Sequence, residues 1–166
     1  FHNQLRIDDL LQFRGIGEVK AVKLLALAEL SRRMSQQRIH SDMSFMDSSK
    51  VAAYYMEKLR HLHTEQVLAV FLDGRGRYLG EETLSTGTVN ASLMSPREIF
   101  IAALKHNASG LILLHNHPSG DPTPSLQDQN ITLRIAENGK LLNIPLIDHI
   151  IIGDHTYTSF RELEQI

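Results

Sequence analysis

The chain has 166 residues, of which 42% are hydrophobic and 22% are charged, with a formal net charge of −2 and no cysteine. This length supports one well-buried main domain with a small appendage, and the composition excludes disordered, collagen-like and coiled-coil proteins. Without cysteine there are no disulfides, thiolate zinc clusters or cysteine nucleophile, so any metal must be held by His, Asp or Glu. The apolar runs fall far short of the ~20 residues that cross a bilayer, which predicts a cytoplasmic protein without a membrane partner.

The amino-terminal segment is predicted to be helical and more basic than the rest. Residues 1–40 hold seven Lys/Arg against four Asp/Glu, whereas the remainder holds ten against fifteen. Apolar residues recur at helical spacing over residues 1–35, with an interruption at Gly15-Ile16-Gly17. We expect two helices around a glycine hairpin in residues 1–38, followed by a polar linker over residues 39–47. Because the sequence begins with Phe rather than Met, we expect a fragment of a longer protein.

The next segment predicts a helix followed by a β-hairpin. Apolar spacing over residues 51–62, after a cap at one of residues 47–49, is typical of a helix of about three turns. Residues 65–72 are rich in β-forming side chains and end at the turn sequence Asp73-Gly74-Arg75-Gly76. Residues 78–88 are then expected to return as the antiparallel partner strand.

The remainder predicts helices that alternate with strands. Ser95-Pro96-Arg97-Glu98 has the pattern of a capping box with proline at the first helical position. The expected elements are a helix over residues 96–106, a buried strand over 110–115, the longest helix over 124–142 and one or two strands over 146–157. Their alternation predicts an α/β domain over residues 48–166, with a mixed sheet flanked by helices.

Two histidines close the buried strand. His115 and His117 are two residues apart, so in an extended chain their imidazoles point to the same side. Ligand sites in open α/β sheets tend to lie beyond the carboxyl ends of strands. The two imidazoles are therefore expected to converge on one point there.

A hydroxyl and a carboxylate follow at the start of the next helix. Thr123 is predicted to be the N-cap and Pro124 the first helical residue, which places Ser125 and Asp128 on one face of the first turn. Two His residues and Asp128 make three protein ligands. This is the number used by a catalytic zinc site that keeps its fourth position for water.

The run from His115 to Asp128 resembles a known motif. Its pattern of His-x-His-Pro, six residues, Ser, two residues and Asp is similar to the JAMM (MPN+) metalloprotease motif, and the longer run looks like the bacterial RadC family. The resemblance covers almost all of residues 48–166 through three further segments: Asn90-Ala91-Ser92-Leu93, Pro96-Arg97-Glu98 and Asp148-His149-Ile150-Ile151-Ile152-Gly153. It implies a cytidine-deaminase-like α/β/α fold with zinc bound by His115, His117 and Asp128. The resemblance does not imply the DNA-repair role for which the family was named.

The JAMM motif also needs an upstream glutamate that takes a proton from the zinc-bound water. The candidates are Glu57, Glu65, Glu81, Glu82 and Glu98. We prefer Glu65, because it precedes the strand of residues 66–72, where the family places its glutamate, and because this strand is expected to lie beside residues 110–115. Glu82 is the alternative. By the same resemblance, Ser125 would donate a hydrogen bond to the tetrahedral oxyanion.

The other polar residues are expected to have structural roles or to lie on the surface. Asn116 and Asp121 are loop turn-formers that could also support the metal ligands. Asp148 and His149 lie in an apolar strand and are expected to form a satisfied buried pair rather than to add a fourth ligand. The remaining histidines are expected on the surface: His2, His40, His61, His63, His106 and His155.

The segment Phe13-Arg14-Gly15-Ile16-Gly17-Glu18-Val19-Lys20-Ala21 resembles the hairpin of a helix-hairpin-helix module, a nonspecific DNA-binding element. In such a hairpin Gly15 and Gly17 would let backbone amides approach a phosphate, and Lys20 and Lys23 would supply positive charge. The alternative is a plain connection between two helices that uses glycine for its turn.

These patterns favour zinc-dependent hydrolysis of a peptide or isopeptide bond, with zinc lowering the pKa of water and polarising the carbonyl. The alternative is a DNA-associated binding protein whose metal is structural or vestigial, which salt-dependent DNA retention without peptidase turnover would favour. A zinc deaminase is set aside, because it would need Pro-Cys-x-x-Cys and the chain has no cysteine. The sequence does not predict the substrate or the oligomeric state.

Overall fold

The computed structural model describes residues 6–86 and 95–166, without the side chains of residues 32–42 and 85–86. The chain divides into two compact units, Phe1–Asp42 and Met43–Ile166. The segment Asn90-Ala91-Ser92-Leu93 and the end of the second predicted strand lie outside the described residues. No helix in the described part of the chain is both long and apolar enough to cross a membrane.

The first unit contains two helices around a glycine turn, as predicted. Helix α1 (Ile7–Leu11) and helix α2 (Glu18–Asp42) are joined at Gly15, whose φ of 89° is a conformation that glycine adopts without steric cost. The prediction of a linker over residues 39–47 is wrong for residues 39–42, because α2 continues to Asp42. The polar stretch is rich in Gln and Arg and lacks Gly and Pro, so nothing in it ends a helix. At 25 residues α2 is also the longest helix among the described residues, contrary to the prediction for residues 124–142.

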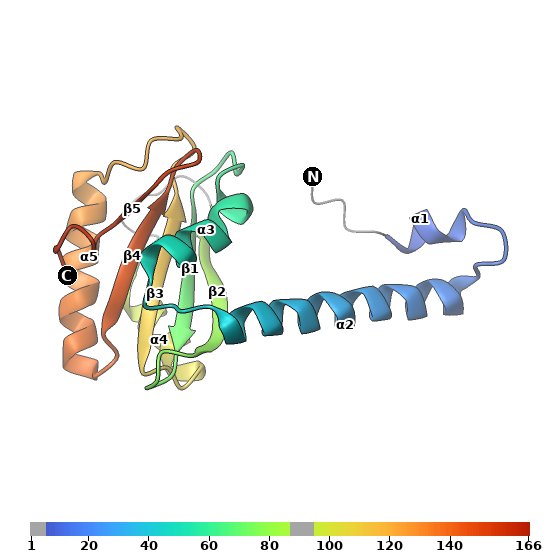
Figure 1. The fold of residues 1–166 in the computed structure, drawn as a ribbon, viewed down its shortest axis with the longest axis horizontal. Helices are drawn as coiled ribbons and strands as arrows, with labels where there is room; N and C mark the ends of the chain where they lie inside the picture. Colours follow the sequence, from blue (N-terminus) through green and yellow to red (C-terminus); the bar gives the residue numbers. More distant parts are fainter. Residues whose placement is uncertain (1–5, 87–94) are drawn as a thin grey trace. The chain divides into compact units, whose positions relative to one another are not determined.

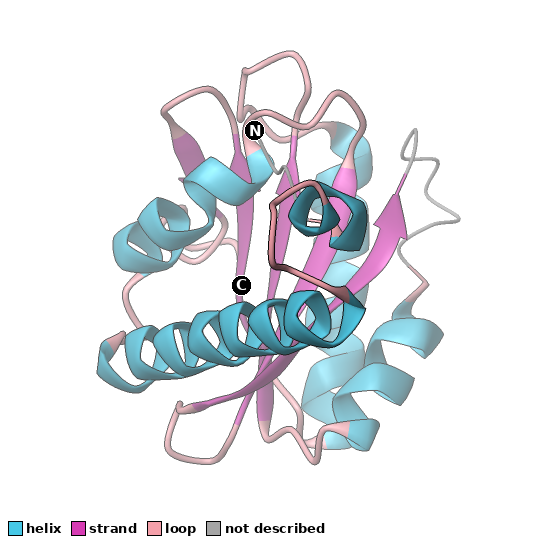
Figure 2. Cartoon of the chain, turned by 90° about the vertical axis from the view of Figure 1, so that its right-hand side faces the viewer, coloured by secondary structure: helices cyan, strands magenta, loops and turns pink. Residues whose placement is uncertain are grey.

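The second unit is built on one twisted, five-stranded sheet (Figure 2). The strands lie in the order β2-β1-β3-β4-β5; β1 is antiparallel to β2 and β3, β3 is parallel to β4, and β4 is antiparallel to β5. The predicted mixed sheet is therefore confirmed. The elements are α3 (Ser48–Leu59), β1 (Gln66–Leu72), β2 (Tyr78–Thr86), α4 (Pro96–Lys105), β3 (Gly110–Asn116), α5 (Leu126–Leu142), β4 (Leu146–Ile152) and β5 (Tyr157–Ser159).

Local side-chain bonds begin α3 and close the first hairpin. The carboxylate of Asp47 accepts a hydrogen bond from the backbone of Lys50 and so caps α3. Hydrogen bonds from Ser49 and Lys50 lower the pKa of Asp47 to about 2. In the turn between β1 and β2, the carboxylate of Asp73 accepts bonds from two backbone amides, at 2.8 and 2.9 Å. Short polar side chains thus set both boundaries.

Helices cover both faces of the sheet, which gives the predicted α/β/α layering (Figure 1). Alternate residues of β1 point to opposite layers and are buried in both, as in a central strand with no face in water. Helices α4 and α5 pack on the layer that includes Val67, Ala69, Phe71, Leu111 and Leu113. Helix α3 packs on the layer that includes Leu68, Val70, Leu72, Ile112, Leu114, Ile150 and Ile152.

The topology brings three distant segments to one edge of the sheet. Because β1 runs antiparallel to β3, its first residues lie beside the last residues of β3, with Val67 opposite His115. Strands β3 and β4 are parallel and joined through α5, so α5 begins beyond the carboxyl end of β3. The start of β1, the end of β3 and the first turn of α5 therefore meet.

Asp148 and His149 do not form the pair predicted from the sequence. They are consecutive in β4, so their side chains point to opposite faces of the sheet. The fully buried carboxylate of Asp148 accepts hydrogen bonds from the hydroxyls of Ser48 at 2.6 Å and Ser159 at 2.8 Å, and from the backbone amide of Arg161 at 3.2 Å. Asp148 thus ties α3 and the carboxyl-terminal segment to the sheet.

Asp148→Ala should lower the free energy of unfolding by about 3 to 5 kcal/mol, because it removes the acceptor of several buried donors. Glu137→Ala, which removes an exposed carboxylate from α5, is the control and should change stability by less than about 0.5 kcal/mol. Urea unfolding of both variants, followed by circular dichroism, measures the difference. Equal stability of the two would show that Asp148 is not a structural tie.

Candidate metal centre

Three side chains capable of binding a metal converge at the shared edge of the sheet. They are His115 at the end of β3, His117 just beyond it and Asp128 in the first turn of α5, with one ligand atom from each lying within 4.8 Å of the others. The Nε2 atoms of the two histidines are 3.1 Å apart. The carboxylate oxygens of Asp128 lie 3.3 Å from Nε2 of His115 and 3.5 Å from Nε2 of His117.

The orientation of His117 is set by a backbone carbonyl. Its Nδ1 lies 2.8 Å from the carbonyl oxygen of Asp121. A carbonyl only accepts, so Nδ1 carries the hydrogen, and the neutral ring presents a lone pair at Nε2. Asp121 therefore supports the candidate metal site through its main chain. Its carboxylate instead accepts from the backbone and hydroxyl of Thr123, at 2.9 and 2.6 Å.

Asp128 is held by the residue that begins α5. Ser125 is the N-cap, so the prediction of Thr123 as the cap is wrong by two residues. The reason is the bond between Thr123 and Asp121, which keeps residues 121–123 in a turn before the helix. The amide of Ser125 donates to Oδ2 of Asp128 at 2.7 Å, and its hydroxyl accepts from the amide of Asp128 at 3.1 Å, which closes a capping box. The hydroxyl of Ser125 also donates to Oδ2 of Asp128, at 2.6 Å.

The electrostatics of this cluster favour a cation. Burial by itself would raise the pKa of Asp128, but its contacts with His115 and His117, together with the hydrogen bond from Ser125, hold this pKa well below its usual range. The contact with Asp128 raises the pKa of His117, against the opposing effect of burial. Two imidazole nitrogens and an ionised carboxylate thus face one point. Nitrogen and oxygen donors of these kinds are ligands that Zn²⁺ takes in proteins, so the donor set fits a zinc ion.

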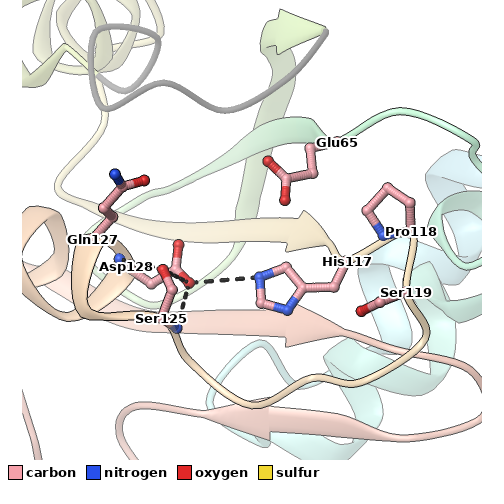
Figure 3. Close-up of a pocket in the computed structure, with 7 residues that line it drawn as sticks. All are labelled: Glu65, His117, Pro118, Ser119, Ser125, Gln127 and Asp128. Carbon is pink, nitrogen blue, oxygen red and sulfur yellow. Dashed lines mark hydrogen bonds and ion pairs between the residues drawn. The ribbon is translucent and has the colours of Figure 1, made fainter.

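Glu65 borders the same site. It lies just before β1 and lines a pocket of about 290 Å³ together with His117, Pro118, Ser119, Ser125, Gln127 and Asp128 (Figure 3). Its side chain is half-buried and is directed toward His117 in this view. The expectation that its strand lies beside β3 is confirmed by the pairing of β1 with β3.

Asn116 fixes the segment that carries Glu65. This fully buried amide accepts a hydrogen bond from the backbone of Gln66 at 2.8 Å, and it donates to the carbonyl oxygens of Thr64 at 3.2 Å and Leu62 at 3.4 Å. These three bonds bracket Glu65 in the chain. Asn116 is therefore more than a turn-former, because it joins the end of β3 to the chain on both sides of Glu65.

The other candidate glutamates lie outside this pocket. Glu82, the alternative base, lies 3.0 Å from Nε2 of His106, which faces it from the end of α4. The remaining three have other surroundings: Glu57 binds Arg60, Glu81 binds Tyr55 and Lys58, and Glu98 is exposed in the first turn of α4.

Sequence reasoning missed one histidine that contacts the candidate metal site. The ring of His149 lies behind His115, with its Nε2 2.8 Å from Nδ1 of His115. Its own Nδ1 lies 2.6 Å from the hydroxyl of Thr132 in α5. Complete burial lowers the pKa of His149 well below its usual range. The alternation of side chains along β4 was the available signal, because it places residues 148 and 149 in different layers.

The prediction that the other histidines lie on the surface is wrong for His106. Its ring is half-buried and stacks on Phe71 with 4.5 Å between ring centroids. The side chains of His2 and His40 are outside the described residues, whereas three histidines are exposed as predicted: His61, His63 and His155.

The structure of the first unit does not confirm the predicted helix-hairpin-helix module around Gly15 and Gly17. Gly15, Gly17, Lys20 and Lys23 are all exposed. The ammonium group of Lys20 donates to the carbonyl oxygen of Gly15 at 2.9 Å, so it closes the turn. Binding of DNA at these four residues stays a prediction.

Any nonspecific duplex binding by this chain should depend on Lys20 and Lys23. Replacing both with Ala should weaken binding to all duplex sequences alike and reduce the salt slope of log Kobs by about two, because each phosphate contact releases close to one counterion. Fluorescence anisotropy with a labelled duplex at several salt concentrations measures this slope. A double variant that binds like the unchanged chain would exclude the glycine turn as the DNA site.

Comparison with known proteins extends the similarity to most of the chain. A family model described as "RadC-like JAB domain" matches residues 45–165. A UPF0758 protein of Desulforamulus reducens is 42% identical over 159 residues, which cover 96% of this chain and 70% of that protein. UPF0758 proteins of Halalkalibacterium halodurans and Clostridium botulinum are 41% and 42% identical; each alignment covers 94% of this chain, and 67% and 68% of those proteins.

Proposed function

Because the chain belongs to the RadC-like JAB domain family, we propose that it is a zinc-dependent hydrolase that cleaves a peptide or isopeptide bond. Family membership confirms the resemblance read from the sequence. The relatives named above carry no activity in their names, so the chemistry is argued from the site. The observation that carries it is the convergence of His115, His117 and Asp128 beside Glu65 in one pocket.

The ligand set favours a catalytic metal over a structural one. Structural zinc is usually enclosed by four protein ligands, whereas catalytic zinc has three and an open position. Three ligand side chains converge here, and the pocket next to them is lined by His117 and Asp128. A bound zinc ion would supply a Lewis acid that lowers the pKa of water to about 7 and polarises the scissile carbonyl.

Glu65 is the proposed general base. Its carboxylate borders the pocket but is not one of the three converging ligands, so it can exchange protons while they hold the metal. It would take a proton from the attacking water and deliver it to the leaving amine. The three backbone bonds of Asn116 support this role, because they restrict the chain on both sides of Glu65.

Ser125 is the proposed donor to the oxyanion. Its hydroxyl has one hydrogen, which is directed at Oδ2 of Asp128. The backbone amide of Ser125 donates to the same oxygen at 2.7 Å and would still hold the carboxylate after the hydroxyl turns away. Ser125 can therefore orient Asp128 through its amide and stabilise negative charge on the substrate through its hydroxyl.

Zinc-dependent cleavage is the experiment that tests this function. The full chain, loaded with zinc, would be incubated with peptide libraries that contain ordinary and lysine-linked isopeptide bonds, and new amines would be detected by mass spectrometry. We expect cleavage that a chelator abolishes and added zinc restores. Zinc-loaded protein that cleaves no more than chelated protein would refute the hydrolase and favour a binding protein with a structural metal.

A further inference from the structure

Two buried side chains extend the metal centre into the core. His149 in β4 and Thr132 in α5 are both 0% exposed. His149 lies between His115 and Thr132, at 2.8 and 2.6 Å. The hydroxyl of Thr132 also lies 2.5 Å from the carbonyl oxygen of Asp128. An unbroken line of polar contacts thus runs from one proposed ligand to the main chain of another.

The donor in each contact along this line can be worked out by starting from the carbonyl of Asp128. The carbonyl of Asp128 only accepts, so the hydroxyl hydrogen of Thr132 lies in that bond. The contact between Thr132 and His149 then takes its hydrogen from Nδ1 of His149. A neutral His149 consequently accepts at Nε2, so the hydrogen in the last contact belongs to Nδ1 of His115.

The surroundings of His149 keep its ring neutral. Its two nitrogens face another imidazole and a hydroxyl, neither of which is an anion. Phe160 stacks on the ring with 5.0 Å between centroids. A charged imidazole in such a place would lose its hydration without gaining a direct anionic partner.

We propose that His149 and Thr132 are positioning residues that fix His115 in the tautomer whose Nε2 is free to bind zinc. This inference rests on the proposed metal site and names what prepares it. Both proposed histidine ligands then donate a hydrogen bond from Nδ1 and keep Nε2 free. The acceptor is the imidazole of His149 for His115 and the carbonyl of Asp121 for His117. Such partners of ligand side chains fix the tautomer and the ring orientation.

The hydroxyl of Thr132 determines which ring nitrogen of His149 carries the hydrogen. Without it, the N–H at Nδ1 of His149 would face a methyl group and stay unsatisfied, which is costly in a core. The ring avoids this cost by carrying its hydrogen on Nε2 instead. That hydrogen would be donated to Nδ1 of His115 and would move the hydrogen of His115 onto Nε2, the nitrogen that must bind the metal.

Thr132→Val therefore removes this hydroxyl but keeps the shape of the side chain. Thr132→Ser keeps the hydroxyl and is the matched control. The affinity of the full chain for zinc would be measured by competition with a chromophoric chelator. We expect Thr132→Val to bind zinc about 10- to 100-fold more weakly, the usual effect of losing a ligand's supporting partner, and Thr132→Ser to bind like wild type. Thermal unfolding with chelator present shows whether each variant is folded.

Long-range ¹H–¹⁵N NMR of the imidazoles provides a readout that a merely structural role would not change. In metal-free wild type, both His115 and His149 should carry hydrogen on Nδ1, and Thr132→Val should move it to Nε2. A hydrogen on Nε2 of His149 in wild type, or equal zinc affinity of wild type and Thr132→Val, would overturn the inference. Wild type that binds no zinc would instead refute the proposed function, and the tautomers of the metal-free protein would still decide the direction of the line.

Discussion

Glu65→Gln should reduce zinc-dependent hydrolysis by about 10²- to 10⁴-fold while the zinc content stays near one equivalent. Glutamine keeps the size and hydrogen-bonding reach of Glu65 but cannot accept the proton of the attacking water. The metal is expected to remain, because His115, His117 and Asp128 are unchanged. Cleavage rates, together with metal analysis of the same protein samples, measure both quantities.

Two further variants make this result specific. Glu98→Gln removes an exposed carboxylate that does not line the pocket and should leave the rate unchanged. Asp128→Asn weakens a ligand, so zinc content and activity should fall together. Glu65 would be excluded as the base if Glu65→Gln cleaved at the wild-type rate, and Glu82→Gln would then be the next variant to examine.

The ligand cluster could be anticipated because it is local in sequence. His115, His117 and Asp128 lie within one strand, loop and helix start, where the two-residue spacing in the strand and the first helical turn determine the direction of each side chain. The motif therefore predicts their convergence without knowledge of the sheet. The exact start of α5 is less predictable, since Thr and Ser are both good caps and a turn at Asp121 decides between them.

Contacts that depend on the sheet were harder to anticipate. Glu65 reaches the pocket only because β1 pairs with β3, which the sequence suggested but could not align. The partners of His149 depend on the register of β4 and on the face toward α5. Strand β4 is almost entirely buried, so its hydrophobic pattern does not distinguish its two faces, and Asp148 and His149 looked like a pair.

His117→Ala should abolish stoichiometric zinc binding. The two remaining ligands no longer enclose an ion, so affinity should fall by more than the roughly 10- to 100-fold that loss of a supporting partner costs. Because protons compete with the metal for imidazole and carboxylate ligands, wild type should also release zinc as the pH falls. Metal analysis after dialysis, and chelator competition at several pH values, measure both effects.

A matched histidine variant separates loss of a ligand from a general effect. His61→Ala removes an imidazole that is 62% exposed and belongs to no ligand cluster of the described residues, so its zinc content should equal that of wild type. If His117→Ala held as much zinc as His61→Ala, the metal would lie elsewhere. The roles proposed for Glu65, Ser125 and Thr132 would then fall together, because each of them is defined by its position relative to the three ligands.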